Sequence, residues 1–175
     1  MKTPPSEPAQ PSPVTPADPV SFRYALGRLA KGVAVATTLS DGHDHAMTVD
    51  TLMSVSLDPL LVLVCVENDA RFRLAVEECG LWGVSILAAT ARDAASWFAS
   101  RGRPLTGQLD AFPFHRDASG VALLDGALAT LSVTTSALHP AGDHTIVVGR
   151  VEAIELPDTV GDALVFYRGQ FTRLS

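Results

Sequence analysis

The segment Leu128–Ile154 reads LATLSVTTSALHPAGDHTIVVGRVEAI and predicts two long β-strands in succession. Two sets of side chains alternate along its first half: Leu131, Val133, Thr135 and Ala137 on one face, and Thr130, Ser132, Thr134 and Ser136 on the other. This alternation is typical of a half-buried antiparallel strand. A turn containing Gly142 then leads into the second strand, which carries on one face His144, Ile146, Val148 and Arg150. Strands that follow one another without an intervening helix favour an antiparallel sheet over a doubly wound parallel one.

Working outward, three short helices are predicted within residues 21–32, 70–80 and 90–102. Each has a glycine placed to end it, and Thr90 with Asp93 resembles a capping box at the start of the third. Their apolar stripes are, in order, Phe22, Ala25, Leu26 and Leu29; Phe72, Ala75, Val76 and Cys79; and Ala91, Ala94, Ala95 and Phe98.

Further strands lie between these helices. Residues 33–49 predict a hairpin whose turn is residues 40–45, with Asp41-Gly42 at its centre. The continuous apolar run 59–66 predicts a strand buried on both faces. Shorter strands are predicted at 81–87 and 163–169, and residues 103–127 read as a loop-rich excursion. About seven strands and three helices predict a mainly β chain with α, an antiparallel barrel with peripheral helices.

The composition is that of a soluble globular protein with one domain. The chain has 175 residues, of which 47% are hydrophobic and 18% charged, and its net charge is −6. Lys and Arg form no cluster, which argues against nucleic-acid binding. No apolar run approaches the roughly 20 residues of a membrane helix, and no secretory signal is present. Cys65 and Cys79 are interpreted as core thiols of a cytoplasmic protein.

Residues 1–20 contain most of the chain's 12 prolines. Proline fixes φ and removes a backbone donor, so this segment is predicted to form neither a helix nor the interior of a sheet. It is interpreted as an extended arm ahead of a domain at residues 21–175. The arm is either a mobile tail or a segment that packs across a partner subunit.

Histidines offer the first candidates for chemistry. His43 and His45 fall in the predicted hairpin turn and are interpreted as solvated surface, because a catalytic zinc needs three ordered protein ligands. No metal site is predicted. His144 stands where a turn enters a strand, next to an acid, so it either contacts a ligand near neutral pH or has a structural role.

Small hydroxyl side chains gather between two apolar strands, at Thr48, Thr51, Ser54 and Ser56. Together with their backbone N–H groups they could hydrogen-bond a flat heteroaromatic ring. The alternative is a strand and turn with a polar face.

Four segments occur in the order typical of the flavin reductase-like family, which the chain resembles from about residue 22 to residue 171. They are FRYALGRLAKGVAVATT at 22–38, AMTVDTLMSVSLDPLLVLVCV at 46–66, GDHTIVVGRV at 142–151 and LVFYRG at 164–169. The combination of SVSLDP with GDHTIVVG is the most specific part. Members are short-chain reductases that supply reduced flavin to two-component monooxygenases.

The resemblance implies an FMN-binding split barrel that works as a homodimer with flavin near the interface. It implies hydride transfer from NADH or NADPH to N5 of FMN or FAD, and a separate oxygenase that receives the reduced flavin. Three groups of site residues are implied: Thr48, Val49, Asp50, Thr51, Leu52, Ser54 and Val55 along the flavin ring; Asp69, Ala70 and Arg71 near the ribityl phosphate; and His144 on the nicotinamide side, with Tyr167, Arg168 and Gly169 closing that pocket.

The chain departs from the family pattern at both flavin-binding segments. Asp50 stands where relatives often have Asn or Gln, and Ala70 and Phe72 replace hydroxyl side chains, while Arg71 keeps its charge. An ionised Asp50 would disfavour an anionic reduced flavin or hydrogen-bond a ring N–H, so we expect it to face the ligand and be partly solvated. The departures leave two alternatives open: a protein that retains its flavin without reducing free flavin, and a flavin-free structural homologue.

Overall fold

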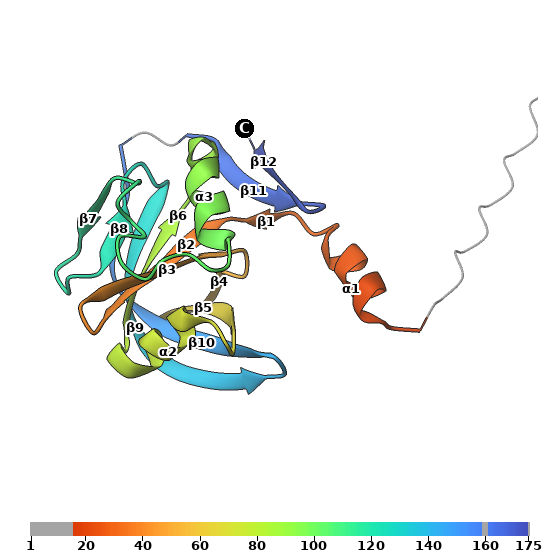
Figure 1. Cartoon of the computed structure of the whole chain (residues 1–175), viewed down its shortest axis with the longest axis horizontal. Coiled ribbons are helices and arrows are strands. Elements are labelled where there is room, and N and C mark those ends of the chain that lie inside the picture. The colour runs from red at the N-terminus through yellow and green to blue at the C-terminus, as the bar shows by residue number, and fades with distance from the viewer. Residues whose placement is uncertain (1–15, 159–160, 175) are drawn as a thin grey trace, which may run out of the picture.

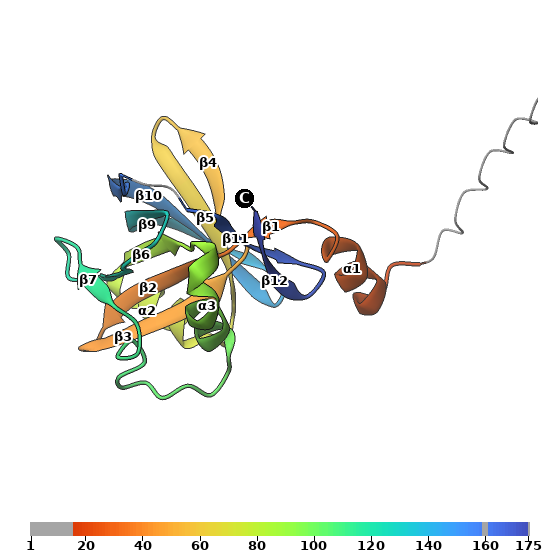
Figure 2. The same ribbon diagram turned by 90° about the horizontal axis from the view of Figure 1, so that it is seen from above.

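The body of the molecule is one antiparallel sheet that bends into a barrel (Figures 1 and 2). The computed structural model of the chain describes residues 16–158 and 161–174. The strands of this sheet are β2 (Ala34–Ser40), β3 (His43–Val49), β4 (Met53–Leu57), β5 (Leu60–Glu67), β6 (Leu81–Ile86), β9 (Ala129–Ala141) and β10 (His144–Glu155). Their order is β3-β2-β6-β9-β10-β5-β4, and the central pair is the β9–β10 hairpin predicted from the sequence.

Two smaller sheets and the helices lie around this barrel. One sheet contains β1 (Lys31–Gly32), β11 (Ala163–Tyr167) and β12 (Gln170–Leu174), and the other β7 (Phe114–Arg116) and β8 (Ala122–Leu124). The helices are α1 (Pro19–Leu26), α2 (Arg71–Cys79) and α3 (Arg92–Ala99), the last preceded by the 3₁₀ turn η1 (Ala89–Ala91). The sequence predicted fewer strands because β1, β4, β7, β8 and β12 are short. Among the described residues no helix is long and apolar enough to cross a membrane.

Strand β2 separates two hydrophobic cores. Ala34 and Ala36 belong to a cluster with Trp82, whereas Val33 and Val35 belong to a second cluster with Phe98 of α3. Successive residues of a strand point to opposite faces, so β2 is buried on both sides. Helix α3 and the β7–β8 hairpin cover one face of this part of the sheet, and α2 the other.

The larger core is built around Trp82, which is fully buried. Gly149 on β10 makes room for the indole, because a Cβ at this position would lie 2.6 Å from Trp82 Cζ2. The ladder between β9 and β10 also shifts register next to Gly149. The long hairpin therefore bends over the indole.

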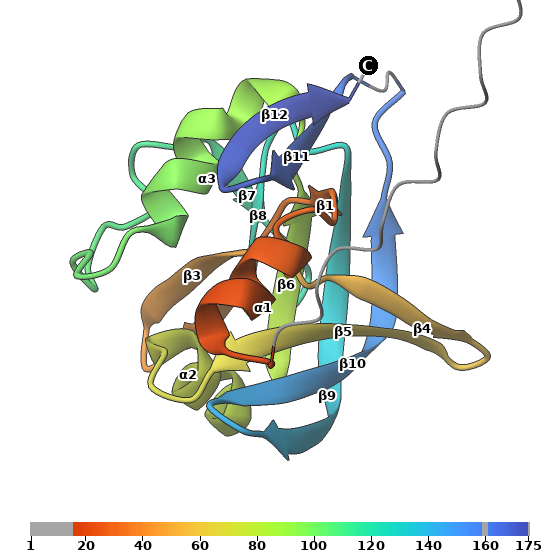
Figure 3. The same cartoon turned by 90° about the vertical axis from the view of Figure 1, so that its right-hand side faces the viewer.

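Helix α1 corrects the prediction for the N-terminal segment. The helix begins at Pro19 with Asp18 as its N-cap and ends at Leu26, whereas an arm was expected through residue 20 and a helix as far as Gly32. Proline is suited to the first helical turn, where its missing N–H has no partner to lose. Phe22 is 64% exposed, since α1 stands off from the body and buries none of its residues (Figure 1). Seen from that side, the helix lies in front of the barrel (Figure 3). Residues 1–15 of the predicted arm lie outside the described residues.

The strand bounds, the turn geometry and the helix caps confirm some of the other local predictions and correct the rest. The Asp41-Gly42 turn is confirmed, with φ of 51° and 73°, and the three predicted helices exist. The prediction that β5 is buried on both faces is wrong: its buried residues alternate with partly exposed ones. His43 and His45 belong to β3 and not to the turn. The capping box of Thr90 and Asp93 does not form, because η1 separates Thr90 from α3 and the N-cap is Ala91, without a side-chain bond.

Candidate functional site

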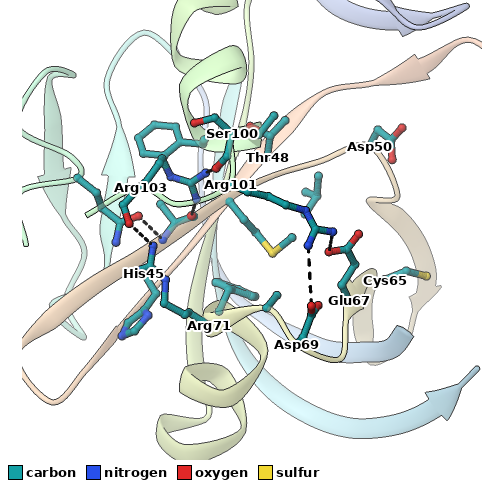
Figure 4. Close-up of a pocket in the computed structure, with 18 of the residues that line it drawn as sticks. His45, Thr48, Asp50, Cys65, Glu67, Asp69, Arg71, Ser100, Arg101 and Arg103 are labelled. Atoms are coloured by element: carbon teal, nitrogen blue, oxygen red, sulfur yellow. Dashed lines mark hydrogen bonds and ion pairs between the residues drawn. The ribbon is translucent and has the colours of Figure 1, made fainter. Parts of the chain in front are cut away.

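A cavity of about 480 Å³ lies between the end of β3, the step from β5 into α2, and the loop that follows α3 (Figure 4). This volume falls within the roughly 300–1,000 Å³ typical of small-molecule sites. The predicted site residues that line it are Thr48, Val49, Asp50, Thr51, Asp69, Ala70, Arg71 and His144. They come from three separate segments of the chain, so the fold brings together the predicted ring, phosphate and nicotinamide residues.

Six predicted site residues do not line this cavity. Leu52 packs against the larger core, and Ser54 and Val55 lie exposed on β4, next to the sheet edge. Tyr167, Arg168 and Gly169 form the turn between β11 and β12, where Arg168 N–H donates to the carbonyl of Gly27. Their proposed contacts with a ligand stay predictions.

The two threonines of the predicted ring segment use their hydroxyls to hold the cavity wall. Thr48 Oγ1 donates to the carbonyl of Ala95 at 2.7 Å, which ties β3 to α3. Thr51 Oγ1 accepts from Cys65 N–H at 2.9 Å, which ties the β3–β4 connection to β5. Among the described residues, no amide of residues 50–52 donates to a main-chain carbonyl. Backbone N–H groups, more than hydroxyls, are thus free to meet a ligand here.

Asp50 is paired with a cation that the sequence analysis did not connect to it. Its carboxylate forms an ion pair with Lys31 Nζ from β1, and the side chain is 29% exposed. It lies at the end of the cavity close to Cys65 (Figure 4). Lys31 therefore offsets the negative charge of Asp50 at this end of the cavity.

The opposite end of the cavity carries two arginines held by main-chain carbonyls. Arg103 donates to the carbonyls of Ala46 at 2.7 Å and Trp97 at 3.2 Å, and Arg71 donates to the carbonyl of Arg103 at 2.7 Å. Desolvation lowers the pKa of Arg103, with a further contribution from the Arg71 charge. Buried Arg103 Nε has no hydrogen-bond partner among the described residues.

His45 lies next to these arginines, on β3. Burial, followed by the positive charge of Arg71, lowers the pKa of its imidazole, so the ring is neutral at pH 7. Its buried Nδ1 has no hydrogen-bond partner within the described chain. The earlier interpretation of His45 as solvated surface is wrong, because β3 begins three residues earlier than predicted and carries this side chain to the cavity.

His144 lies at the start of β10, on the cavity wall that also carries Glu67 and Asp69. Its Nδ1 is 2.7 Å from Asp143 Oδ1, and this hydrogen bond lowers the pKa of the Asp143 carboxyl. Asp143 thereby orients the imidazole while leaving its other nitrogen available. No group of three or more potential metal ligands is found among the described residues.

The sequence analysis missed the contribution of the loop after α3. Arg101 and Arg103 flank Gly102 in this loop and line the cavity, together with Ser100 and Gln108. The available signal was two arginines on either side of Gly102, the glycine placed to end the predicted helix, with Arg103 opening the segment interpreted as a loop. Arg101 forms ion pairs with Glu67 and Asp69 on the opposite wall (Figure 4).

Comparisons with known proteins agree with this architecture. The model of the flavin reductase like domain matches residues 26–175. An NADH-dependent flavin reductase from Rhodococcus sp is 43% identical over 159 residues, which cover 89% of this chain and 86% of the relative. The reductase subunit of a flavin-dependent monooxygenase from Mycobacterium tuberculosis is 32% identical, covering 89% and 82%. The solved NADH:FAD oxidoreductase of Streptomyces globisporus, in complex with NAD and FAD fragments, superposes with a TM-score of 0.86 at 31% identity, covering 94% of this chain and 98% of that one.

Proposed function

This chain belongs to the flavin reductase-like family, and we propose that it reduces FMN or FAD with NADH or NADPH and supplies the reduced flavin to a separate monooxygenase. The observation that carries the proposal is the cavity in which the ring segment, Arg71 and His144 meet. NADH is the preferred nucleotide in this proposal, because the Rhodococcus relative is named as NADH-dependent. The Mycobacterium relative, named as a reductase subunit of a monooxygenase, supports the separate partner.

The residues of the cavity fit a flavin nucleotide. The free amides of Asp50 and Thr51 offer donors to the edge of a planar heterocycle, and Arg71 keeps donors beyond the one bound to a carbonyl. Arg103 holds the loop after α3 against β3 and so fixes the position of Arg71. When bound, the flavin supplies the redox chemistry and accepts the hydride. His144, oriented by Asp143, would contact the nicotinamide of the bound nucleotide.

The assembly proposed here is a homodimer in the cytoplasm. Exposed apolar side chains lie along α1 and the β4–β5 hairpin, and apolar groups gathered on a surface often mark a protein–protein contact. The most exposed of them are Leu57 at 83% and Tyr24 at 74%. A second copy would cover this surface. Cys65 and Cys79 are free thiols, which supports a reducing compartment.

A turnover assay tests the proposal. Purified protein is mixed with NADH or NADPH, with and without FMN or FAD, and nucleotide oxidation is followed. We expect oxidation that needs added flavin and that is faster with NADH. Absence of flavin-dependent oxidation with either nucleotide would contradict the proposal, whereas protein that keeps a bound flavin through dialysis and turns over slowly would favour the alternative of a flavin-retaining enzyme.

A further inference from the structure

The three arginines of the cavity are held in two different ways. Arg71 and Arg103 donate to main-chain carbonyls and form no ion pair with a carboxylate of the described residues. Arg101 binds carboxylates instead: its Nη2 is 2.6 Å from Glu67 Oε2, and its Nη1 is 3.8 Å from Asp69 Oδ2. Only the contacts of Arg101 are thus of a kind that an anionic ligand can replace directly.

The side chain of Arg101 crosses the cavity. It starts from the loop after α3, and its partners lie on the opposite wall, at the end of β5 and just before α2 (Figure 4). The side chains of Arg101 and Asp69 are 76% and 77% exposed. Exposed ion pairs contribute little net free energy because water and salt screen them. A ligand that enters the cavity can therefore displace this pair without a large cost.

The charges around the cavity favour such an exchange for a phosphate. Glu67 and Asp69 carry two negative charges against the single positive charge of Arg101, so this wall repels anions. Arg71 and Arg103 attract them at the other end. A guanidinium exchanges readily between a carboxylate and a phosphate, because both accept two parallel N–H bonds from its planar fork.

We propose that Arg101 is an exchange latch, which pairs with Glu67 and Asp69 in the open site and turns to the phosphate of a bound flavin nucleotide. Glu67 then competes with that phosphate for the same guanidinium. The competition limits affinity and returns Arg101 to the wall when the flavin leaves. This inference rests on the proposed function, in which reduced flavin must be released to a second protein.

Flavin titration of three variants tests the latch. FMN and riboflavin, which lacks the phosphate, are titrated into wild-type protein, Arg101→Gln, Glu67→Gln and the double variant, with flavin fluorescence as the readout. We expect Arg101→Gln to weaken FMN binding about fivefold and Glu67→Gln to tighten it by a few fold, both typical of charge-assisted contacts. Riboflavin binding should not change. Glu67→Gln should tighten FMN binding less in the Arg101→Gln background than in wild-type protein, since only the direct repulsion of the phosphate by Glu67 is then left to remove.

A matched control is Glu77→Gln, which removes a carboxylate that pairs with Arg73 on α2, outside the cavity. It should leave FMN affinity unchanged. Weaker FMN binding by Glu67→Gln, or equal effects on FMN and riboflavin, would overturn the latch. A higher KM for NADH in Arg101→Gln with an unchanged Kd for FMN would overturn its assignment to the flavin phosphate. Failure of the wild-type protein to bind either flavin would instead contradict the proposed function.

Discussion

The electrostatic effect of Asp50 depends on a neighbour that is distant in the sequence and close in space. In the sequence it is an acid where relatives often carry an amide, next to a predicted flavin ring. In the structure Lys31 pairs with it, so the two charges largely cancel at that end of the cavity. The pair leaves the electrostatics near the ring closer to those of an amide than the sequence alone indicates.

We expect Asp50→Asn to tighten the binding of flavin, and of its anionic reduced form most strongly. The substitution leaves Lys31 without its counter-ion, and an unpaired cation favours a nearby anion. Flavin titration under oxidising and reducing conditions measures the effect, with Lys31→Met expected to act in the opposite direction. If neither variant changes flavin affinity, Asp50 only shapes the segment between β3 and β4.

His144→Ala is expected to raise the KM for the nicotinamide nucleotide severalfold and to leave the Kd for FMN nearly unchanged. The imidazole lines the cavity at the start of β10, is oriented by Asp143 and is assigned to the nicotinamide, not to the flavin phosphate. Steady-state kinetics at saturating FMN give the first quantity and titration gives the second. The matched control is His139→Ala, an exposed histidine on β9 outside the cavity, which should change neither.

At the scale of elements, one of the contacts that join the β7–β8 hairpin to the main sheet passes through the imidazole of His115. His115 Nδ1 lies 2.7 Å from Asp125 Oδ1, and its Nε2 lies 2.9 Å from Glu155 Oε2 at the end of β10. The hydrogen bond with Asp125 is the main cause that raises the pKa of His115, and Glu155 adds to it. The charged imidazolium therefore stabilises the folded hairpin.

This raised pKa predicts a pH dependence of stability. The contribution is fully present below the unfolded pKa of about 6.5, and it is lost as pH rises through the higher folded pKa. We expect the Tm of wild-type protein to fall more than that of His115→Gln when pH is raised from 6 to 8, by a small margin because the groups are exposed. Parallel Tm curves for the two proteins would contradict a charged His115 in the fold.

At the scale of the whole molecule, the exposed apolar surface of α1 and the β4–β5 hairpin supports the proposed dimer. Leu57→Asp should shift the protein from dimer to monomer in size-exclusion chromatography with light scattering, because a carboxylate in a dry interface is costly. Leu74→Asp is a matched control, since Leu74 is 57% exposed on α2, away from that surface. Monomeric wild-type protein, or a Leu57→Asp variant that stays dimeric, would contradict the proposed interface.

Local sequence patterns predicted much of the fold. Alternation over Leu128–Ile154 predicted the central β9–β10 hairpin, Asp41-Gly42 predicted the β2–β3 turn, and the apolar stripe of α2 predicted its buried face. These features depend on residues close in the chain, where period and turn chemistry are decisive. The short strands were not predictable in this way because each has at most five residues, too few for a clear alternation. The position of α1 was not predictable because the helix buries none of its residues against the body.

The sequence by itself determined the family, the antiparallel barrel and most of the segments that meet at the cavity, because these depend on motifs and periodicity that the chain carries locally. Only the tertiary structure decided which charges face one another. It paired Lys31 with Asp50, turned His45 inward and set Arg101 across from Glu67. Such pairings join residues that are far apart in the chain, and their energies depend on distance and burial, which no local pattern specifies.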